Sequence, residues 1–165
     1  MFIILKSGRG IIRMITFGVM ALGVILDRIT KFFVLSTMQE GESISIWHDF
    51  FYLSCIKNQG IAFGLFPNNK NFFIITTIII ICILLYYWKS IPKGNIWIQI
   101  AIGLILGGAL GNLWDRIAFG SVIDFIDIGY NNYRWPAFNL ADSIICVGVG
   151  MMLIDFMTAK KSNLE

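Results

Sequence analysis

The sequence has little of several residue types that soluble enzymes use for catalysis. Its 165 residues include one histidine, His48, and three cysteines, none of them spaced as CxxC. An odd number of cysteines without that spacing argues against a disulfide framework and a zinc site, so we expect no metal and no cofactor. Neither HExxH nor GxSxG occurs, which disfavours a metalloprotease and a serine hydrolase.

Charge is also scarce, and no basic run is present. Only 14% of the residues are charged, whereas soluble domains carry about a quarter. Hydrophobic residues make up 57% of the chain, and its mean hydropathy is +0.76. This composition therefore indicates a protein embedded in lipid rather than one surrounded by water. We expect no nucleic acid partner, and the length indicates a single domain, residues 1–165.

Four apolar segments predict four transmembrane helices, over about 11–31, 72–88, 96–116 and 139–157. At a rise of 1.5 Å per residue, roughly 20 residues cross the hydrocarbon core. The first segment follows basic residues, as in a signal peptide, but no small-x-small cleavage site comes after it. We interpret it as a retained helix.

The loops between the apolar segments predict a small β-rich region outside the cytoplasm. Residues 43–58 and 121–128 alternate partly and are rich in aromatic and β-branched side chains, which favours short strands. The expected fold is thus mainly α, a membrane protein with a small extracytoplasmic sheet. Glycines in the third and fourth apolar segments are expected to let helices approach closely. They are Gly103, Gly107, Gly111, Gly148 and Gly150.

Basic residues predict the orientation of the helices. They gather at the N-terminus, between the second and third apolar segments, and after the fourth, whereas acids outnumber bases in the other two loops. Cytoplasmic loops carry the excess of Lys and Arg, so both termini are expected in the cytoplasm. The residues are Lys6, Arg9, Arg13, Lys89, Lys93, Lys160 and Lys161.

Polar residues converge at the outer ends of the predicted helices. Those on helices are three or four positions apart, which places them on one helix face. A charged group near hydrocarbon costs several kcal/mol unless it is paired or hydrated, so this crowding predicts a site. The residues are Asp27 and Lys31 on the first helix, Asn112, Asp115 and Arg116 on the third, Asp124 in the last loop, and Asn139 and Asp142 on the fourth.

Two aspartates held a few ångström apart support peptide hydrolysis by water. Such carboxyls do not both ionise easily and share one proton. The ionised carboxylate takes a proton from water, and the neutral carboxyl donates to the carbonyl oxygen. This chemistry needs neither a metal nor a nucleophilic side chain.

Other interpretations fit the same residues. Three aspartates at one depth suit a proton or ion relay in a transporter or channel, and the outer loops suit a non-catalytic assembly factor. Several residues are also typical of structural roles. These are a pair between Asp115 and Arg116, a helix cap at Asn139, and an interfacial ion pair between Asp27 and Lys31.

Five segments, in order along most of the chain, resemble those of the bacterial lipoprotein signal peptidases, also called signal peptidase II. They are Asp27-Arg-Ile-Thr-Lys31, Asn58-Gln-Gly-Ile-Ala-Phe-Gly64, Gly107-Gly-Ala-Leu-Gly-Asn-Leu-Trp-Asp-Arg116, Gly120-Ser-Val-Ile-Asp-Phe125 and Phe138-Asn-Leu-Ala-Asp-Ser143. The resemblance implies an aspartic endopeptidase that removes signal peptides from prolipoproteins. It cuts before a lipobox cysteine that carries a diacylglyceryl thioether.

The resemblance also implies where the enzyme works and with which residues. It implies a multi-pass protein of the bacterial cytoplasmic (inner) membrane, with its site near the outer leaflet surface. Prolipoproteins and membrane lipids are the implied partners, and we expect a monomer. Asp124 and Asp142 match the family's catalytic pair. The implied supporting residues are Asp27, Lys31, Asn58, Asn112, Asp115, Arg116 and Asn139.

Two further expectations concern how that site is completed. Asp115 and Arg116 are expected to brace it, and Asn58, Asn112 and Arg116 to position the substrate. Aromatic residues of the first outer loop are expected either to cover the site or to form an ordinary interfacial belt. These are Trp47, Phe50, Phe51, Phe63 and Phe66.

Overall fold

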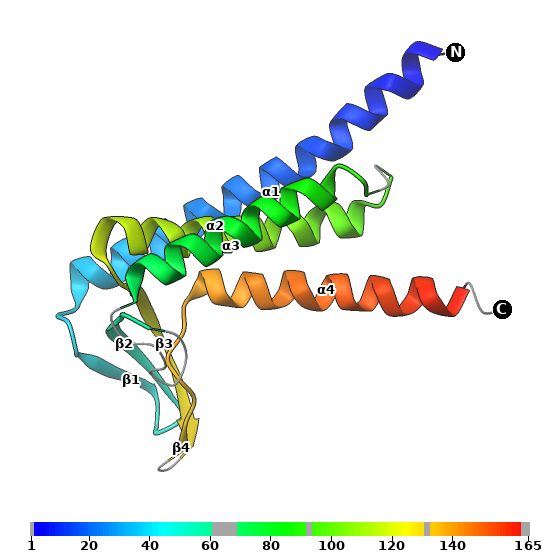
Figure 1. The fold of residues 1–165 in the computed structure, drawn as a ribbon. Helices are drawn as coiled ribbons and strands as arrows, with labels where there is room; N and C mark the ends of the chain where they lie inside the picture. Colours follow the sequence, from blue (N-terminus) through cyan, green and yellow to red (C-terminus); the bar gives the residue numbers. More distant parts are fainter. Residues whose placement is uncertain (1, 61–68, 92–93, 131–132, 163–165) are drawn as a thin grey trace.

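The computed structural model contains four helices and a four-stranded sheet that extends from one end of the helices (Figure 1). It describes residues 2–60, 69–91, 94–130 and 133–162, with side chains described from residue 13 to residue 158. The helices are α1 (Phe2–Thr37), α2 (Lys70–Trp88), α3 (Ile96–Phe119) and α4 (Leu140–Ser162). The strands are β1 (Ser43–Trp47), β2 (Phe51–Asn58), β3 (Val122–Tyr130) and β4 (Tyr133–Arg134).

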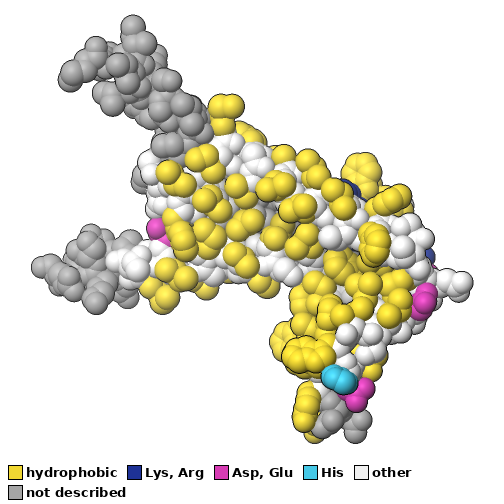
Figure 2. Space-filling view, turned by 180° about the vertical axis from the view of Figure 1, so that it is seen from behind, with side chains coloured by type: hydrophobic (Ala, Val, Ile, Leu, Met, Phe, Trp, Pro, Cys, Tyr) yellow, Lys and Arg dark blue, Asp and Glu magenta, His cyan; other side chains and the backbone are white. Residues whose placement is uncertain are grey.

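The prediction of a mainly helical chain with a small β-rich region is confirmed. Three helices are long and apolar enough to cross a membrane: α2, α3 and α4 as far as Thr158. Within 13–37, every 18-residue stretch of α1 holds three charged residues, so its membrane span stays a prediction. Figure 2 shows apolar side chains over much of one face of the helical part, where lipid would contact them.

The centre of the helical part is α3, which packs against both α1 and α4. Glycines make these approaches possible: a Cβ on Gly103 would lie 2.8 Å from the carbonyl oxygen of Thr16, and one on Gly148 would lie 2.7 Å from that of Ala101. The packing prediction is therefore confirmed for these glycines, and it is wrong for Gly150. No described atom lies within 4 Å of a Cβ placed there.

The sheet is antiparallel, in the order β1-β2-β3-β4. Gly120, with a φ of 76°, ends α3 in the left-handed region and turns the chain into β3. After β4, Phe138 pairs with Ile126 of β3, which returns the chain to the start of α4. This path places the beginning of β3 beside the first turn of α4, at the junction between sheet and helices.

Candidate active site

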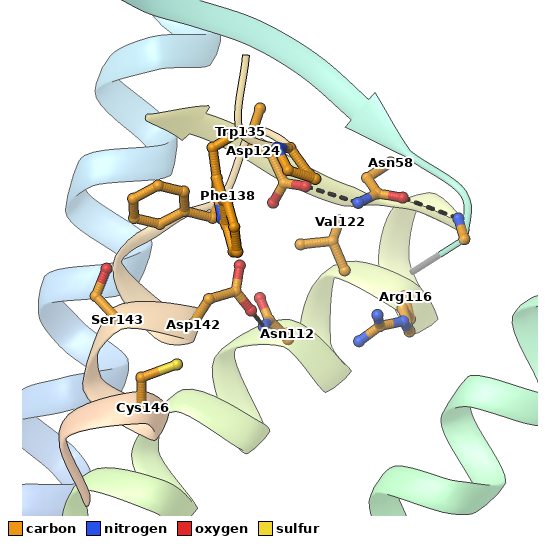
Figure 3. A pocket seen from close by; sticks show the side chains of 13 residues that line it. Asn58, Asn112, Arg116, Val122, Asp124, Trp135, Phe138, Asp142, Ser143 and Cys146 are labelled. Carbon is orange, nitrogen blue, oxygen red and sulfur yellow. Dashed lines mark hydrogen bonds between the residues drawn. The ribbon is translucent and has the colours of Figure 1, made fainter. Parts of the chain in front are cut away.

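Asp124 and Asp142 line one pocket at that junction. Asp124 is the third residue of β3, and Asp142 lies in the first turn of α4. The cavity measures about 410 Å³, and Figure 3 shows the side chains of both aspartates, one on the strand and one on the helix, pointing toward one another. It is lined by Asn58, Gly60, Asn112, Arg116, Val122, Asp124, Trp135, Pro136, Ala137, Phe138, Asp142, Ser143 and Cys146.

Asn58 and Asn139 hold the carboxylate of Asp124. The Nδ2 of Asn139 donates to Oδ1 at 2.7 Å, and the Nδ2 of Asn58 donates to Oδ2 at 2.8 Å. The amide oxygen of Asn58 accepts the backbone N–H of Gly60 at 2.9 Å, and that of Asn139 accepts the backbone N–H of Asp142 at 3.0 Å. These bonds fix the orientation of both amides, so their NH₂ groups must face Asp124.

Asn112 performs the same task for Asp142. Its Nδ2 donates to Oδ1 of Asp142 at 2.7 Å, while its own oxygen accepts Lys31 Nζ at 2.9 Å. The backbone N–H of Asn139 donates to Oδ2 of Asp142 at 3.1 Å, which also caps α4. All four carboxylate oxygens of the two aspartates therefore accept a hydrogen bond.

A neutral group of four charged side chains lies behind Asn112. Lys31 approaches Asp27 at 3.0 Å and Asp115 at 2.7 Å, and Arg28 bridges the same two carboxylates. Both aspartates are fully buried. Buried charges of this kind require complete pairing, and here two anions meet two cations. The group, which we call the charge quartet, consists of Asp27, Arg28, Lys31 and Asp115.

The quartet corrects and extends the sequence predictions. Asp115 pairs with Arg28 and Lys31, whereas Arg116 lies with its guanidinium 5.3 Å from the Phe73 ring. The interpretation of Asp115 and Arg116 as an ion pair is therefore wrong. Arg28 was not predicted from the sequence, because a lone arginine beside Asp27 is typical of an interfacial residue. Only the packing of α1 on α3 shows that Arg28 also pairs with Asp115.

The residues named from sequence occupy two layers. Asn58, Asn112, Arg116, Asp124 and Asp142 line the pocket. Asn139 connects Asn112 to Asp124, since its Nδ2 also approaches Asn112 Oδ1 at 3.2 Å. Asp27, Lys31 and Asp115 lie behind in the quartet. The apolar wall formed by residues 135–138 was not predicted, because its aromatic and proline residues carry no catalytic signal of their own.

The aromatic residues of the first outer loop have a different place from the expected cover. Trp47, Phe50 and Phe51 are not among the residues that line the pocket, and Trp47 and Phe50 pack edge to face at 5.5 Å. Phe63 and Phe66 lie outside the described residues. Among the described residues, the aromatic side chains that line the pocket are Trp135 and Phe138, from the segment that precedes α4.

β3 carries a second aspartate, Asp127, which does not line the pocket as Asp124 does. Asp127 accepts Arg134 Nε at 2.8 Å and Ser54 Oγ at 3.3 Å, so it belongs to the sheet. The pKa of Asp124 is raised to about 6, chiefly by burial and also by the charge of Asp142, against the opposing hydrogen bonds from Asn58 and Asn139. A carboxyl with that pKa can hold a proton close to neutral pH.

Comparisons with known proteins agree with this arrangement. The family described as Signal peptidase (SPase) II matches residues 19–158. The lipoprotein signal peptidase of Syntrophotalea carbinolica is 40% identical over 134 residues, covering 79% of this chain and 83% of that protein. The lipoprotein signal peptidase of Alteromonas mediterranea is 39% identical over 150 residues, covering 88% and 82%.

Solved structures show the same fold. A bacterial membrane enzyme determined by the in meso method at 2.3 Å resolution superposes with a TM-score of 0.82 at 35% identity, covering 89% of this chain and 90% of that one. A second, at 1.9 Å, gives 0.75 at 36% identity, covering 86% and 91%. Together these matches define a membrane-integral bacterial peptidase of the aspartic type. The chain belongs to the signal peptidase II family.

Proposed function

We propose that this enzyme removes signal peptides from prolipoproteins whose lipobox cysteine carries a diacylglyceryl thioether, and that it cuts just before that cysteine. The names of the relatives support the substrate class. The observation that carries the proposal is the pair of aspartates, Asp124 and Asp142, at the edge of one largely apolar pocket. An apolar lining suits a lipidated substrate better than a soluble peptide.

Asp142 acts as the base and Asp124 as the acid of the pair. Asp142 lies in the first turn of α4, where its carboxylate accepts the backbone N–H of Asn139 and faces the pocket. Asp124 is 2% exposed, and its raised pKa favours retention of the shared proton. The carboxylate of Asp142 removes a proton from water as the oxygen attacks the scissile carbonyl, and Asp124 donates its proton to the carbonyl oxygen.

Collapse of the resulting tetrahedral intermediate completes the reaction. The proton gained by Asp142 passes to the departing nitrogen, the C–N bond breaks, and Asp124 recovers its proton from the gem-diol. Asn58, Asn112 and Arg116 position the substrate backbone from the pocket edge. Asp27, Lys31 and Asp115 brace the site indirectly, because Lys31 fixes the amide of Asn112 that donates to Asp142.

The protein works as a monomer and a single domain in the bacterial cytoplasmic membrane. Four helices, α1 included, span the bilayer with both termini in the cytoplasm. The sheet and the pocket then lie at the outer leaflet surface, at the depth where a diacylglyceryl cysteine is anchored. Membrane lipids contact the exposed apolar faces of α2 and α4, whose spanning stretches are only 11% buried in the protein.

Cleavage of a purified lipid-modified precursor tests the proposal. The wild-type protein should release the signal peptide, with mass spectrometry placing the cut before the lipidated cysteine, and chelator should leave the rate unchanged. Asp142→Asn should lower kcat by about 10³-fold or more, because the base is lost. Asp155→Asn, on the same helix but bound to Asn95 away from the pocket, is the matched control.

Two results would contradict this function. Normal turnover by Asp142→Asn would remove the aspartate from the mechanism. A failure of the wild-type protein to process the lipid-modified precursor, in membranes where it is inserted and folded, would reject the substrate class.

A further inference from the structure

Arg134 of β4 joins two regions of the sheet that are distant in sequence, β3 and the segment from Asp49 to Tyr52. Its Nε donates to Asp127 Oδ1 at 2.8 Å, and its Nη2 to the carbonyl oxygen of Asp127 at 3.1 Å. Its Nη1 donates to the carbonyl oxygen of Asp49 at 3.3 Å, between β1 and β2. The guanidinium also lies 4.5 Å from the centre of the Tyr52 ring. These contacts use the planar fork that distinguishes arginine from lysine.

The outer wall of the catalytic pocket begins at the next residue. Trp135, Pro136, Ala137 and Phe138 all line the cavity, and Figure 3 shows Trp135 and Phe138 on the side of Asp124. The backbone N–H of Trp135 bonds to Ile128 O at 2.8 Å, so the wall starts where Arg134 is held.

The other end of the wall is held independently. Phe138 exchanges backbone hydrogen bonds with Ile126 at 2.8 and 3.0 Å. Asn139 follows at once, and it binds Asp124, Asn112 and the start of α4. The wall is therefore a four-residue segment with one anchor at Arg134 and another at Asn139.

We propose that Arg134 is a positioning residue that sets this wall and thereby the affinity of the enzyme for its substrate. The inference rests on the proposed function, since it concerns how that substrate is held. Arg134 itself does not line the pocket, so it acts through residues 135–138. Loss of its contacts weakens the outer anchor of the wall, which keeps the backbone bond from Trp135 to Ile128, whereas Asn139 keeps the two aspartates in place.

Kinetics of the full-length protein on a lipid-modified precursor test the inference. Arg134→Gln should raise KM on the order of tenfold while kcat and its pH profile stay unchanged, because substrate contacts weaken but the aspartates do not move. Arg134→Lys keeps the positive charge but lacks the planar guanidinium, so its KM should lie between those of the wild-type protein and Arg134→Gln. Glu40→Gln is the control, because it removes an exposed ion pair with Lys57 that does not involve the wall.

Other outcomes would overturn the inference. A fall in kcat with KM unchanged, a shifted pH profile, or wild-type kinetics in Arg134→Gln would each do so. If Arg134→Gln does not fold, Asp127→Asn weakens the same contact and should raise KM; an unchanged KM there would also reject the role. Absence of cleavage by the wild-type protein would reject the proposed function and this inference with it.

Discussion

The side-chain amides of Asn58, Asn112 and Asn139 hold the carboxylates of Asp124 and Asp142 in place. An amide group can point either its oxygen or its nitrogen at a carboxylate, and only the nitrogen is favourable. In this protein a backbone N–H or Lys31 occupies each amide oxygen, which leaves the NH₂ groups for Asp124 and Asp142. The carboxylates are therefore held by groups that have no alternative arrangement.

Lys31→Met tests how far the site depends on the charge quartet. The substitution leaves two buried carboxylates, Asp27 and Asp115, with one cation, and it removes the closer of the two donors to the Asn112 oxygen. We expect a loss of roughly 3–5 kcal/mol in the free energy of unfolding and a large loss of kcat.

The control for Lys31→Met is Lys57→Met, which breaks an exposed pair with Glu40 and should unfold like the wild-type protein. Thermal unfolding in detergent and precursor cleavage measure the two effects. Equal stability of the two variants would contradict the role given to the quartet.

The raised pKa of Asp124 predicts a pH dependence of stability. The folded protein retains this proton up to a pH of about 6, whereas the ordinary pKa is 3.8. Between these values the folded state binds more protons than the unfolded chain, so the free energy of unfolding increases as the pH falls, by at most about 3 kcal/mol. Thermal midpoints from pH 7 to pH 4 should show this gain in the wild-type protein and lack it in Asp124→Asn; parallel curves would be the contrary result.

At the scale of elements, the sequence predicts the helices well because lipid imposes a simple constraint. The expected 72–88 and 96–116 correspond to α2 (Lys70–Trp88) and α3 (Ile96–Phe119), with ends within three residues. Helix α1 continues to Thr37, six residues beyond the predicted end, because Asp27 and Lys31 are buried in the quartet and do not mark a boundary.

The strands were predicted only in part. Alternation indicated β1, β2 and β3, but the two-residue β4 is too short to leave a pattern. Register, and with it the meeting of Asn58 and Asp124, depends on contacts between segments far apart in the chain. The candidate residues could thus be named from motifs, whereas their division into pocket lining and quartet required the structure.

Two glycines of α4 provide a matched test of helix packing. A Cβ on Gly148 would lie 2.7 Å from Ala101 O and from Ile105 Cγ1, whereas Gly150 has no described atom within 4 Å. We expect Gly148→Ala to lower the thermal midpoint and the cleavage rate, because α4 must move away from α3 and carries Asp142 with it. Gly150→Ala should match or exceed the wild-type stability, and equal effects of the two would argue against the packing described.

At the scale of the whole molecule, the protein consists of a bundle of apolar helices and a sheet that extends from one end of it. The proposed orientation places the exposed Ser45 of β1 outside the cytoplasm and the exposed Ser90, between α2 and α3, inside. A membrane-impermeant maleimide applied to intact cells should therefore label Ser45→Cys and leave Ser90→Cys unlabelled, with the parent protein as background. Labelling of Ser90→Cys but not of Ser45→Cys would contradict the proposed orientation.

The central claim is that Asp124 and Asp142 together hold one proton at the pocket edge. Infrared titration of the purified protein between pH 5 and pH 8 tests it most directly, because a protonated carboxyl has its own carbonyl band. The account predicts a single protonated carboxyl in the wild-type protein that titrates with a pKa of about 6 and is missing from Asp124→Asn. A wild-type protein without that band, or a band that persists in Asp124→Asn, would contradict it.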